Sequence, residues 1–135
     1  IQARWVAMGR PTIVAACPTC QQQMQQHSPE LPVVSLWQLL AQHDLPEGAG
    51  TRLPTVAVQD ACGSRNDPQT HQAVRQLLQT LGAPVEELRY SQNLSKCCNY
   101  GGLMHFGNRA LAREALDVRL DESEQDFLVY CGACR

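Results

Sequence analysis

The spacing of seven cysteines constrains this chain of 135 residues more than any other feature of its sequence. The cysteines occur as Cys17-x2-Cys20, a single Cys62, the adjacent pair Cys97-Cys98 and Cys131-x2-Cys134. Their number is odd, and the chain is larger than the loop-rich domains that disulfides hold together. An adjacent pair is also a poor disulfide, because so small a ring strains the S–S torsion. The pattern indicates a metal, cluster or thiol-redox site in a reducing compartment, and we expect a cytoplasmic protein.

The segments that precede the cysteines predict parallel strands. Short apolar runs at 12–16, 55–58 and 127–130 each lead into a cysteine, and two further runs lie at 32–36 and 85–90. Such runs, alternating with helices, are typical of a parallel sheet with helices packed on its faces. We therefore predict an α/β fold with an open, mainly parallel sheet. Because sites in such sheets form beyond the carboxyl ends of the strands, we expect the cysteines to gather there.

Helix signals fill the segments between these runs. The clearest helix covers 68–81, where Asp67 is a good N-cap residue. Shorter helices are predicted after Pro18 and over 35–43. Another helix follows Asn108, and we expect its buried side to consist of Leu111, Ala115, Leu116 and Val118. The four histidines are expected to face solvent or to be lightly packed.

Composition excludes several classes of function. Eleven Lys and Arg against thirteen Asp and Glu give a formal net charge of −2, so no basic surface for nucleic acid or anionic lipid is present. No apolar run approaches the 18 residues of a membrane-spanning helix. Neither Gly-x-Gly-x-x-Gly nor a Walker motif occurs, so we expect any flavin or nucleotide to bind elsewhere in a larger assembly.

The positions of the cysteines favour inorganic chemistry. Cys17, Cys62 and Cys131 follow predicted strands, where a helix N-terminus would favour the thiolate that ligates metals. After Cys97-Cys98, the cluster-loop residues are Asn99, Gly101 and Gly102, and glycines let the backbone approach a bulky ligand. Two adjacent sulfurs suit a polynuclear cluster better than a disulfide.

The pattern Cys62-x34-Cys97-Cys98-x32-Cys131-x2-Cys134 resembles the cysteine-rich CCG module of heterodisulfide reductases and of the iron–sulfur subunits of glycolate and lactate oxidases. The resemblance covers about residues 55–134. It implies an iron–sulfur cluster, of the 4Fe–4S type and noncubane in the best-understood members. It also implies five metal ligands, which here would be Cys62, Cys97, Cys98, Cys131 and Cys134.

Two departures from the family pattern concern the residues around these ligands. Asn99 stands where the family has the glycine of Cys-Cys-Gly, and asparagine tolerates a left-handed backbone better than most residues. The family's His-Asp-Pro-Cys-His is Gln59-Asp60-Ala61-Cys62-Gly63 here, without either histidine. The second departure removes two histidines that could donate protons near the cluster but keeps the cysteine ligand, and no catalytic residue is assigned.

The resemblance also suggests how the chain is organised. Family members usually carry two copies of the module, and Cys17-x2-Cys20 resembles the closing motif of a preceding copy. We expect 1–45 to be the end of that copy, packed on the next one. We expect 46–54 to be a linker and 55–135 a CCG-type module. The ends of the sequence also suggest a piece of a longer protein.

The leading functional hypothesis is an iron–sulfur-binding redox module of a larger oxidoreductase, of the heterodisulfide-reductase or 2-hydroxy-acid-oxidase type. It would relay electrons from a flavin-containing or ferredoxin-type partner to a quinone, an iron–sulfur protein or a disulfide. We expect a cytoplasmic location, which includes the inner face of the membrane if partner subunits bind there. One alternative is a zinc-stabilised structural or docking module. The other is a dithiol–disulfide oxidoreductase, or a second metal site, using Cys17 and Cys20.

Overall fold

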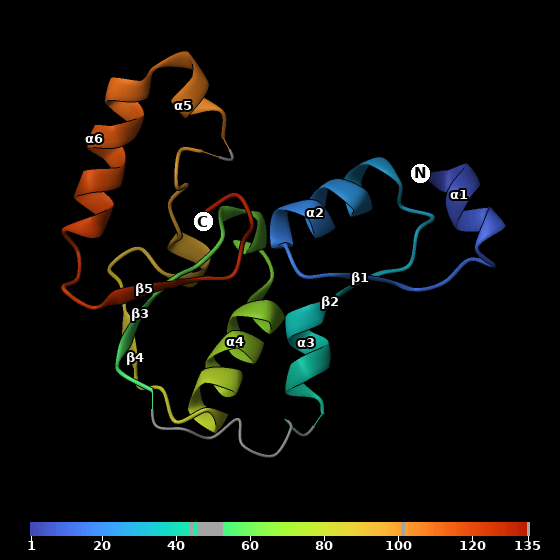
Figure 1. Ribbon diagram of the computed structural model, residues 1–135, viewed down its shortest axis with the longest axis horizontal. Helices are drawn as coiled ribbons and strands as arrows, with labels where there is room; N and C mark the ends of the chain where they lie inside the picture. Colours follow the sequence, from blue (N-terminus) through green and yellow to red (C-terminus); the bar gives the residue numbers. More distant parts are fainter. Residues whose placement is uncertain (44, 46–52, 101, 135) are drawn as a thin grey trace.

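The computed structural model describes residues 1–43, 45, 53–100 and 102–134 (Figure 1). Most of the predicted linker, and Gly101 of the predicted cluster loop, lie outside these residues. The helices are α1 (Gln2–Ala7), α2 (Pro18–His27), α3 (Leu36–Ala41), α4 (Pro68–Thr80), α5 (Met104–Gly107) and α6 (Arg109–Leu120), with 3-10 turns η1 (Cys62–Ser64) and η2 (Gln92–Leu94). The strands are β1 (Ile13–Ala15), β2 (Val33–Ser35), β3 (Val56–Gln59), β4 (Val85–Glu87) and β5 (Asp126–Val129).

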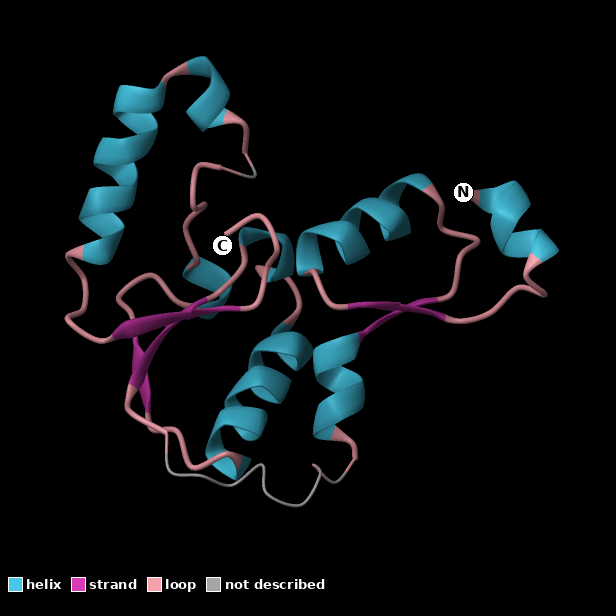
Figure 2. Cartoon of the chain, viewed as in Figure 1, coloured by secondary structure: helices cyan, strands magenta, loops and turns pink. Residues whose placement is uncertain are grey.

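In the described residues, the strands form two parallel sheets. β1 pairs with β2, and β3 lies between β4 and β5 in the order β4-β3-β5. Helices lie on both sides of the strands, with α2 and α3 flanking the first sheet and α4 and α6 flanking the second (Figure 2). The predicted α/β class, with parallel strands and flanking helices, is therefore confirmed. All five predicted strand segments contain strands, and they are shared between the two sheets.

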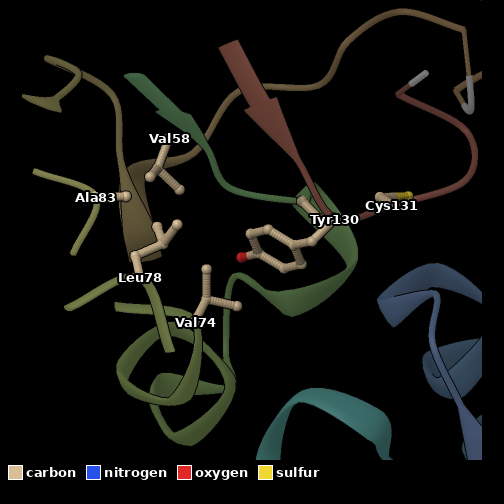
Figure 3. Close-up of a cluster of buried hydrophobic side chains, with 7 residues drawn as sticks. Val58, Val74, Leu78, Ala83, Tyr130 and Cys131 are labelled. Carbon is tan, nitrogen blue, oxygen red and sulfur yellow. The ribbon is translucent and has the colours of Figure 1, made fainter. Parts of the chain in front are cut away.

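The core of the molecule lies between β3 and α4. Ala57 and Val58 of β3 are fully buried, as expected for a central strand covered on both faces. Val74 and Leu78 of α4 pack against this strand, and Tyr130 fills the space beside them (Figure 3). Burying a valine or leucine side chain of this kind contributes roughly 1.5–3 kcal/mol to the free energy of folding. The Tyr130 ring points into this core, while the sulfur of Cys131 points away from it (Figure 3).

Helix α4 begins where its sequence predicts and ends one residue earlier than predicted, at Thr80. The Asp67 side chain accepts a hydrogen bond from the backbone N–H of Thr70 at 3.0 Å, which caps the helix N-terminus. Gly82 follows the last turn with a φ of +71°, a conformation that glycine adopts without steric cost. The side chains of Val74, Leu77 and Leu78 are buried and form the apolar face of the helix.

The predicted buried face of α6 is wrong. Leu111, Leu116 and Val118 are exposed, and the buried residues of this helix are Ala112 and Arg119. The inward face is thus rotated by about one residue, or roughly 100°. The reason is that Arg119 has polar partners inside the protein: its guanidinium donates to Gln59 Oε1, Glu122 and the carbonyl of Tyr90. Apolar periodicity alone does not reveal these partners.

In the part of the chain that the structure describes, no helix combines the length and apolarity needed to cross a bilayer.

Candidate functional site

The cysteines follow strands that run in the same direction. Cys62 opens η1 after β3, and Cys131 follows β5, which is the direct parallel neighbour of β3. Parallel strands share one carboxyl edge, so both cysteines lie at that edge. Cys17 is the N-cap residue of α2, after β1. In Figure 1 the segment after β5 lies beside η1 and the first turn of α2, which brings the three segments together.

Each of the seven cysteines contacts another cysteine. The sulfurs of Cys17 and Cys131 are 3.6 Å apart, although 114 positions separate these residues in the sequence. Further hydrogen-bonded pairs are Cys62–Cys97, Cys98–Cys134, Cys131–Cys134 and Cys17–Cys20. The described residues form no disulfide. The structure therefore brings the five predicted ligands together and adds Cys17 to them, whereas Cys20 is exposed at the margin.

A small cavity lies between the ligand-bearing segments. It has a volume of about 210 Å³, and its walls include Cys62, Cys98, Cys131 and Cys134. This volume far exceeds the share of one water molecule in the liquid, about 30 Å³. Gly102 also lines the cavity, and a Cβ atom on it would lie 3.2 Å from the Cys97 sulfur. The glycine thus lets the loop backbone approach the sulfurs closely.

Asn99 adopts the left-handed backbone conformation that the sequence comparison with Cys-Cys-Gly predicts. Its φ is +68°, a region that asparagine enters more readily than most residues other than glycine. Its backbone N–H donates to the Cys97 sulfur at 3.3 Å. A glycine is therefore not required at this position for the loop to turn, and the turn supplies a hydrogen bond to a predicted ligand.

Packing the thiols together opposes their collective ionisation. Burial raises the pKa of Cys62 to about 11, and the neighbouring Cys97, Cys98 and Cys131 add to this effect. Hydrogen bonds to Cys131 and Cys98 raise the pKa of Cys134 as well. Burial and the neighbouring thiols therefore act against the Cys62 thiolate that its position after a predicted strand was expected to favour.

Cys131 differs from its neighbours because it is surrounded by hydrogen-bond donors. Cys134, Thr19, the backbone of Ala133 and Cys17 all contribute, and they lower the pKa of Cys131 to about 4 despite its burial. The Cys131 thiolate is thus stabilised within the group, and a second thiolate beside it would be repelled by its negative charge. A cation is the partner that would relieve this repulsion.

An all-thiol donor set around a cavity suits an iron–sulfur cluster. Thiolates are the protein ligands of such clusters, and the cavity provides space for a group larger than one ion. Zinc instead requires four N or S donors around one point. Within the described ranges, no three Cys, His, Asp or Glu side chains are arranged to hold a single metal ion.

A buried carboxylate, which sequence reasoning did not single out, connects the ligand-bearing segments. Asp60 is fully buried, two residues before Cys62. Arg75 donates to its two oxygens at 2.6 and 2.7 Å, and the hydroxyl of Tyr130 donates at 2.7 Å. The backbone N–H of Gln92 donates at 2.6 Å. Burial alone would raise the pKa of Asp60, but these donors outweigh it and lower that pKa.

This network fixes the loop that leads to Cys97. Gln92 is held in a left-handed conformation, with a φ of +53°, where its N–H meets Asp60. The side chain of Gln59 donates to the carbonyl of Lys96 at 3.1 Å. Arg65 donates to the carbonyl of Ser95 at 3.1 Å. Residues on either side of Cys62 therefore determine the position of the Cys97 loop.

His71 lies behind the site and is buried, so the expectation of an exposed or lightly packed side chain is wrong here. Its Nε2 lies 3.3 Å from the hydroxyl oxygen of Ser64, which in turn lies 3.1 Å from that of Tyr130. Burial lowers the pKa of His71 and favours the neutral ring. The sequence did carry a signal for this, because His71 shares a helical face with Val74 and Leu78.

The family model of the CCG cysteine-rich domain matches residues 56–135 of this chain. This range is more than half of the chain, and it contains the five predicted ligands but neither Cys17 nor Cys20. No curated protein and no solved structure matches the chain significantly.

Proposed function

This chain belongs to the family of CCG cysteine-rich domains, and we propose that it is an iron–sulfur-binding redox module of a larger oxidoreductase. Family membership supports a metal- or cluster-binding module. The observation that carries the finer proposal is the cavity at the carboxyl edge of the sheet, whose walls contain four of the five predicted ligands. The space between the thiols is larger than one ion, and this favours iron and sulfide over a single zinc ion.

In this proposal, five thiolates hold the cluster, namely Cys62, Cys97, Cys98, Cys131 and Cys134. When bound, the cluster would accept one electron from a donor and pass one to an acceptor. The protein keeps the sulfurs in place through strands β3 and β5 and through the loop that Asp60 anchors. Backbone N–H groups, such as that of Asn99, donate to sulfur and stabilise negative charge there.

The donor would be a flavin-containing or ferredoxin-type partner, and the acceptor a quinone, an iron–sulfur protein or a disulfide. A disulfide acceptor takes up two electrons and two protons, so it requires two successive transfers. We further propose that residues 1–45 are the end of a preceding module. The same order of parallel strand and Cys-x-x-Cys at β1 and β5 supports this division.

A dithiol–disulfide function is the second candidate, and it rests on the Cys17–Cys20 turn. Cys20 is exposed, so an external disulfide can reach this turn, and it is hydrogen-bonded to Cys17. The same hydrogen bond, followed by burial and the charge of Cys17, raises the pKa of Cys20. A raised pKa lowers its thiolate fraction near neutrality, so this candidate ranks second.

The test is the content of iron, acid-labile sulfide and zinc per chain in protein purified without oxygen. Iron and sulfide in near-equal amounts, lost when Cys97 and Cys98 are both replaced by Ser, are the expected result. Zinc at about one per chain, with no iron after anaerobic reconstitution, would overturn the redox proposal in favour of a structural module. Absence of both metals, with a reversible Cys17–Cys20 disulfide, would favour the dithiol function.

A further inference from the structure

The first turn of α2 lies directly against the candidate site, although it is outside the matched family range. The hydroxyl oxygen of Thr19 is 3.3 Å from the Cys131 sulfur, across 112 positions of sequence. Thr19 is also one of the residues that line the 210 Å³ cavity. The chain before the family domain therefore contributes a polar side chain to a predicted ligand.

A glycine beside Cys62 makes this approach possible. A Cβ atom on Gly63 would lie 2.9 Å from both Cα and Oγ1 of Thr19, closer than a real Cβ comes to such atoms. Two of the close atoms, Cα and N, belong to the backbone of Thr19, so a side-chain rotation cannot relieve the clash. Helix α2 thus packs against η1 only because residue 63 has no side chain, and this packing determines where Thr19 stands.

The direction of the Thr19–Cys131 hydrogen bond follows from chemistry. A ligating cysteine is a thiolate, which can only accept, so the threonine hydroxyl must donate. A donor to a ligand sulfur stabilises negative charge at the site. Because reduction adds negative charge, such donors favour the reduced state.

We propose that Thr19 is a positioning residue that raises the reduction potential of the site by donating its hydroxyl hydrogen to the Cys131 sulfur. Gly63 supports this role by letting α2 come within reach. The inference rests on the proposed function, because it requires a redox group on Cys131. It extends that function by giving the β1–α2 segment a role in the chemistry of the following module.

The test compares midpoint potentials of the complete chain, reconstituted without oxygen, as Thr19→Val, Thr19→Ser and wild type. Valine has nearly the shape of threonine but lacks the hydroxyl, so we expect a shift to lower potential at unchanged iron content. Serine keeps the donor and is expected to restore most of the wild-type potential. Thr12→Val is the matched control, because Thr12 is exposed before β1, and no shift is expected.

Gly63→Ala provides a second variant that leaves the hydroxyl in place. Its added methyl group is expected to push α2 away and to shift the potential in the same direction as Thr19→Val. Equal potentials in wild type and Thr19→Val, both fully loaded with iron, would overturn this inference and leave the proposed function standing. Loss of iron from Thr19→Val alone would overturn it in favour of a purely structural role. Failure of the wild type to bind iron would overturn both.

Discussion

Two Cys-x-x-Cys turns follow parallel strands in this molecule, yet their surroundings differ. Cys131 is buried, and it follows a three-stranded sheet with a fully buried carboxylate behind it. Cys17 is half-buried and its partner Cys20 is exposed, after a sheet of two short strands. The motif is the same, so the difference teaches that a site depends on the supporting residues as much as on the cysteines.

The aromatic residues that hold the two turns in place, Tyr130 and Trp37, are also in contact. Tyr130, just before Cys131, donates to Asp60, whereas the backbone before Cys17 is held by the Trp37 indole, which donates to the carbonyl of Ala16 at 2.8 Å. The rings of Trp37 and Tyr130 meet edge to face, with centroids 6.0 Å apart. The aromatic contact thus connects the residues that hold the Cys17–Cys20 turn to those that hold the Cys131–Cys134 turn.

The largest expected difference between the turns concerns metal binding. Cys131→Ser is expected to abolish iron binding after anaerobic reconstitution, because this sulfur lines the cavity. Cys20→Ser is the matched control and should keep the wild-type iron and sulfide content, since Cys20 lies outside the cavity walls. Equal loss in both variants would mean that the two turns form a single ligand set.

The next effect concerns the carboxylate behind the second turn. Asp60→Ala leaves the Arg75 charge and the Tyr130 hydroxyl without their buried partner, and we expect a loss of about 3–5 kcal/mol in the free energy of unfolding. The Glu87 side chain, the outer partner of the same arginine, is 42% exposed. Glu87→Gln should therefore lower the free energy of unfolding by no more than about 1 kcal/mol. Urea unfolding followed by circular dichroism measures both. A cost below about 1 kcal/mol for Asp60→Ala would contradict the central role of this carboxylate.

Acid should weaken the same network in two stages. The pKa of His71 is lowered by burial, so the unfolded chain binds more protons and stability falls as the pH drops below about 6.5. The pKa of Asp60 is also lowered, so its contribution is lost only below about pH 4. Unfolding free energies measured between pH 8 and pH 3 should show both stages, and His71→Gln should remove the first alone. A wild-type stability that is constant from pH 7 to pH 5 would contradict this account.

A smaller effect is expected at the support of the first turn. Trp37→Phe keeps an aromatic ring against Tyr130 but loses the indole donor to Ala16, at a cost of about 1 kcal/mol. It should also speed alkylation of Cys17 by iodoacetamide. Trp5→Phe is the control, because its indole donates to Pro11 near the N-terminus at a similar 2.8 Å. If both variants label Cys17 at the same rate, Trp37 does not hold this turn.

The smallest effect tests the corrected orientation of α6. Val118→Ser places a hydroxyl on an exposed position, and the free energy of unfolding should change by no more than about 0.5 kcal/mol. A loss above about 2 kcal/mol would instead support the buried face that apolar periodicity predicted for this helix.

Local signals predicted the fold well. Strand segments were evident as apolar runs, and the Asp67 cap located the start of α4. The division into two sheets was not predicted, because strand pairing depends on contacts between distant segments. The orientation of α6 failed for a similar reason: Arg119 is buried by partners that lie far away in sequence, such as Gln59.

The cysteine positions alone indicated the candidate site, but not what supports it. Asp60 and Tyr130 stand close to cysteines in sequence, yet their hydrogen bond spans 70 positions. The contact of Thr19 with Cys131 spans 112 positions, and no local pattern marks it. A sequence thus shows donor atoms more readily than the buried groups that orient them.

The most direct test of the central claim is anomalous diffraction at the iron and zinc absorption edges, from crystals grown without oxygen. We predict iron peaks in the cavity at the carboxyl edge of β3 and β5, bonded to the sulfurs of Cys62, Cys97, Cys98, Cys131 and Cys134. A single zinc peak on four of these sulfurs would contradict the claim, as would iron bound only at Cys17 and Cys20.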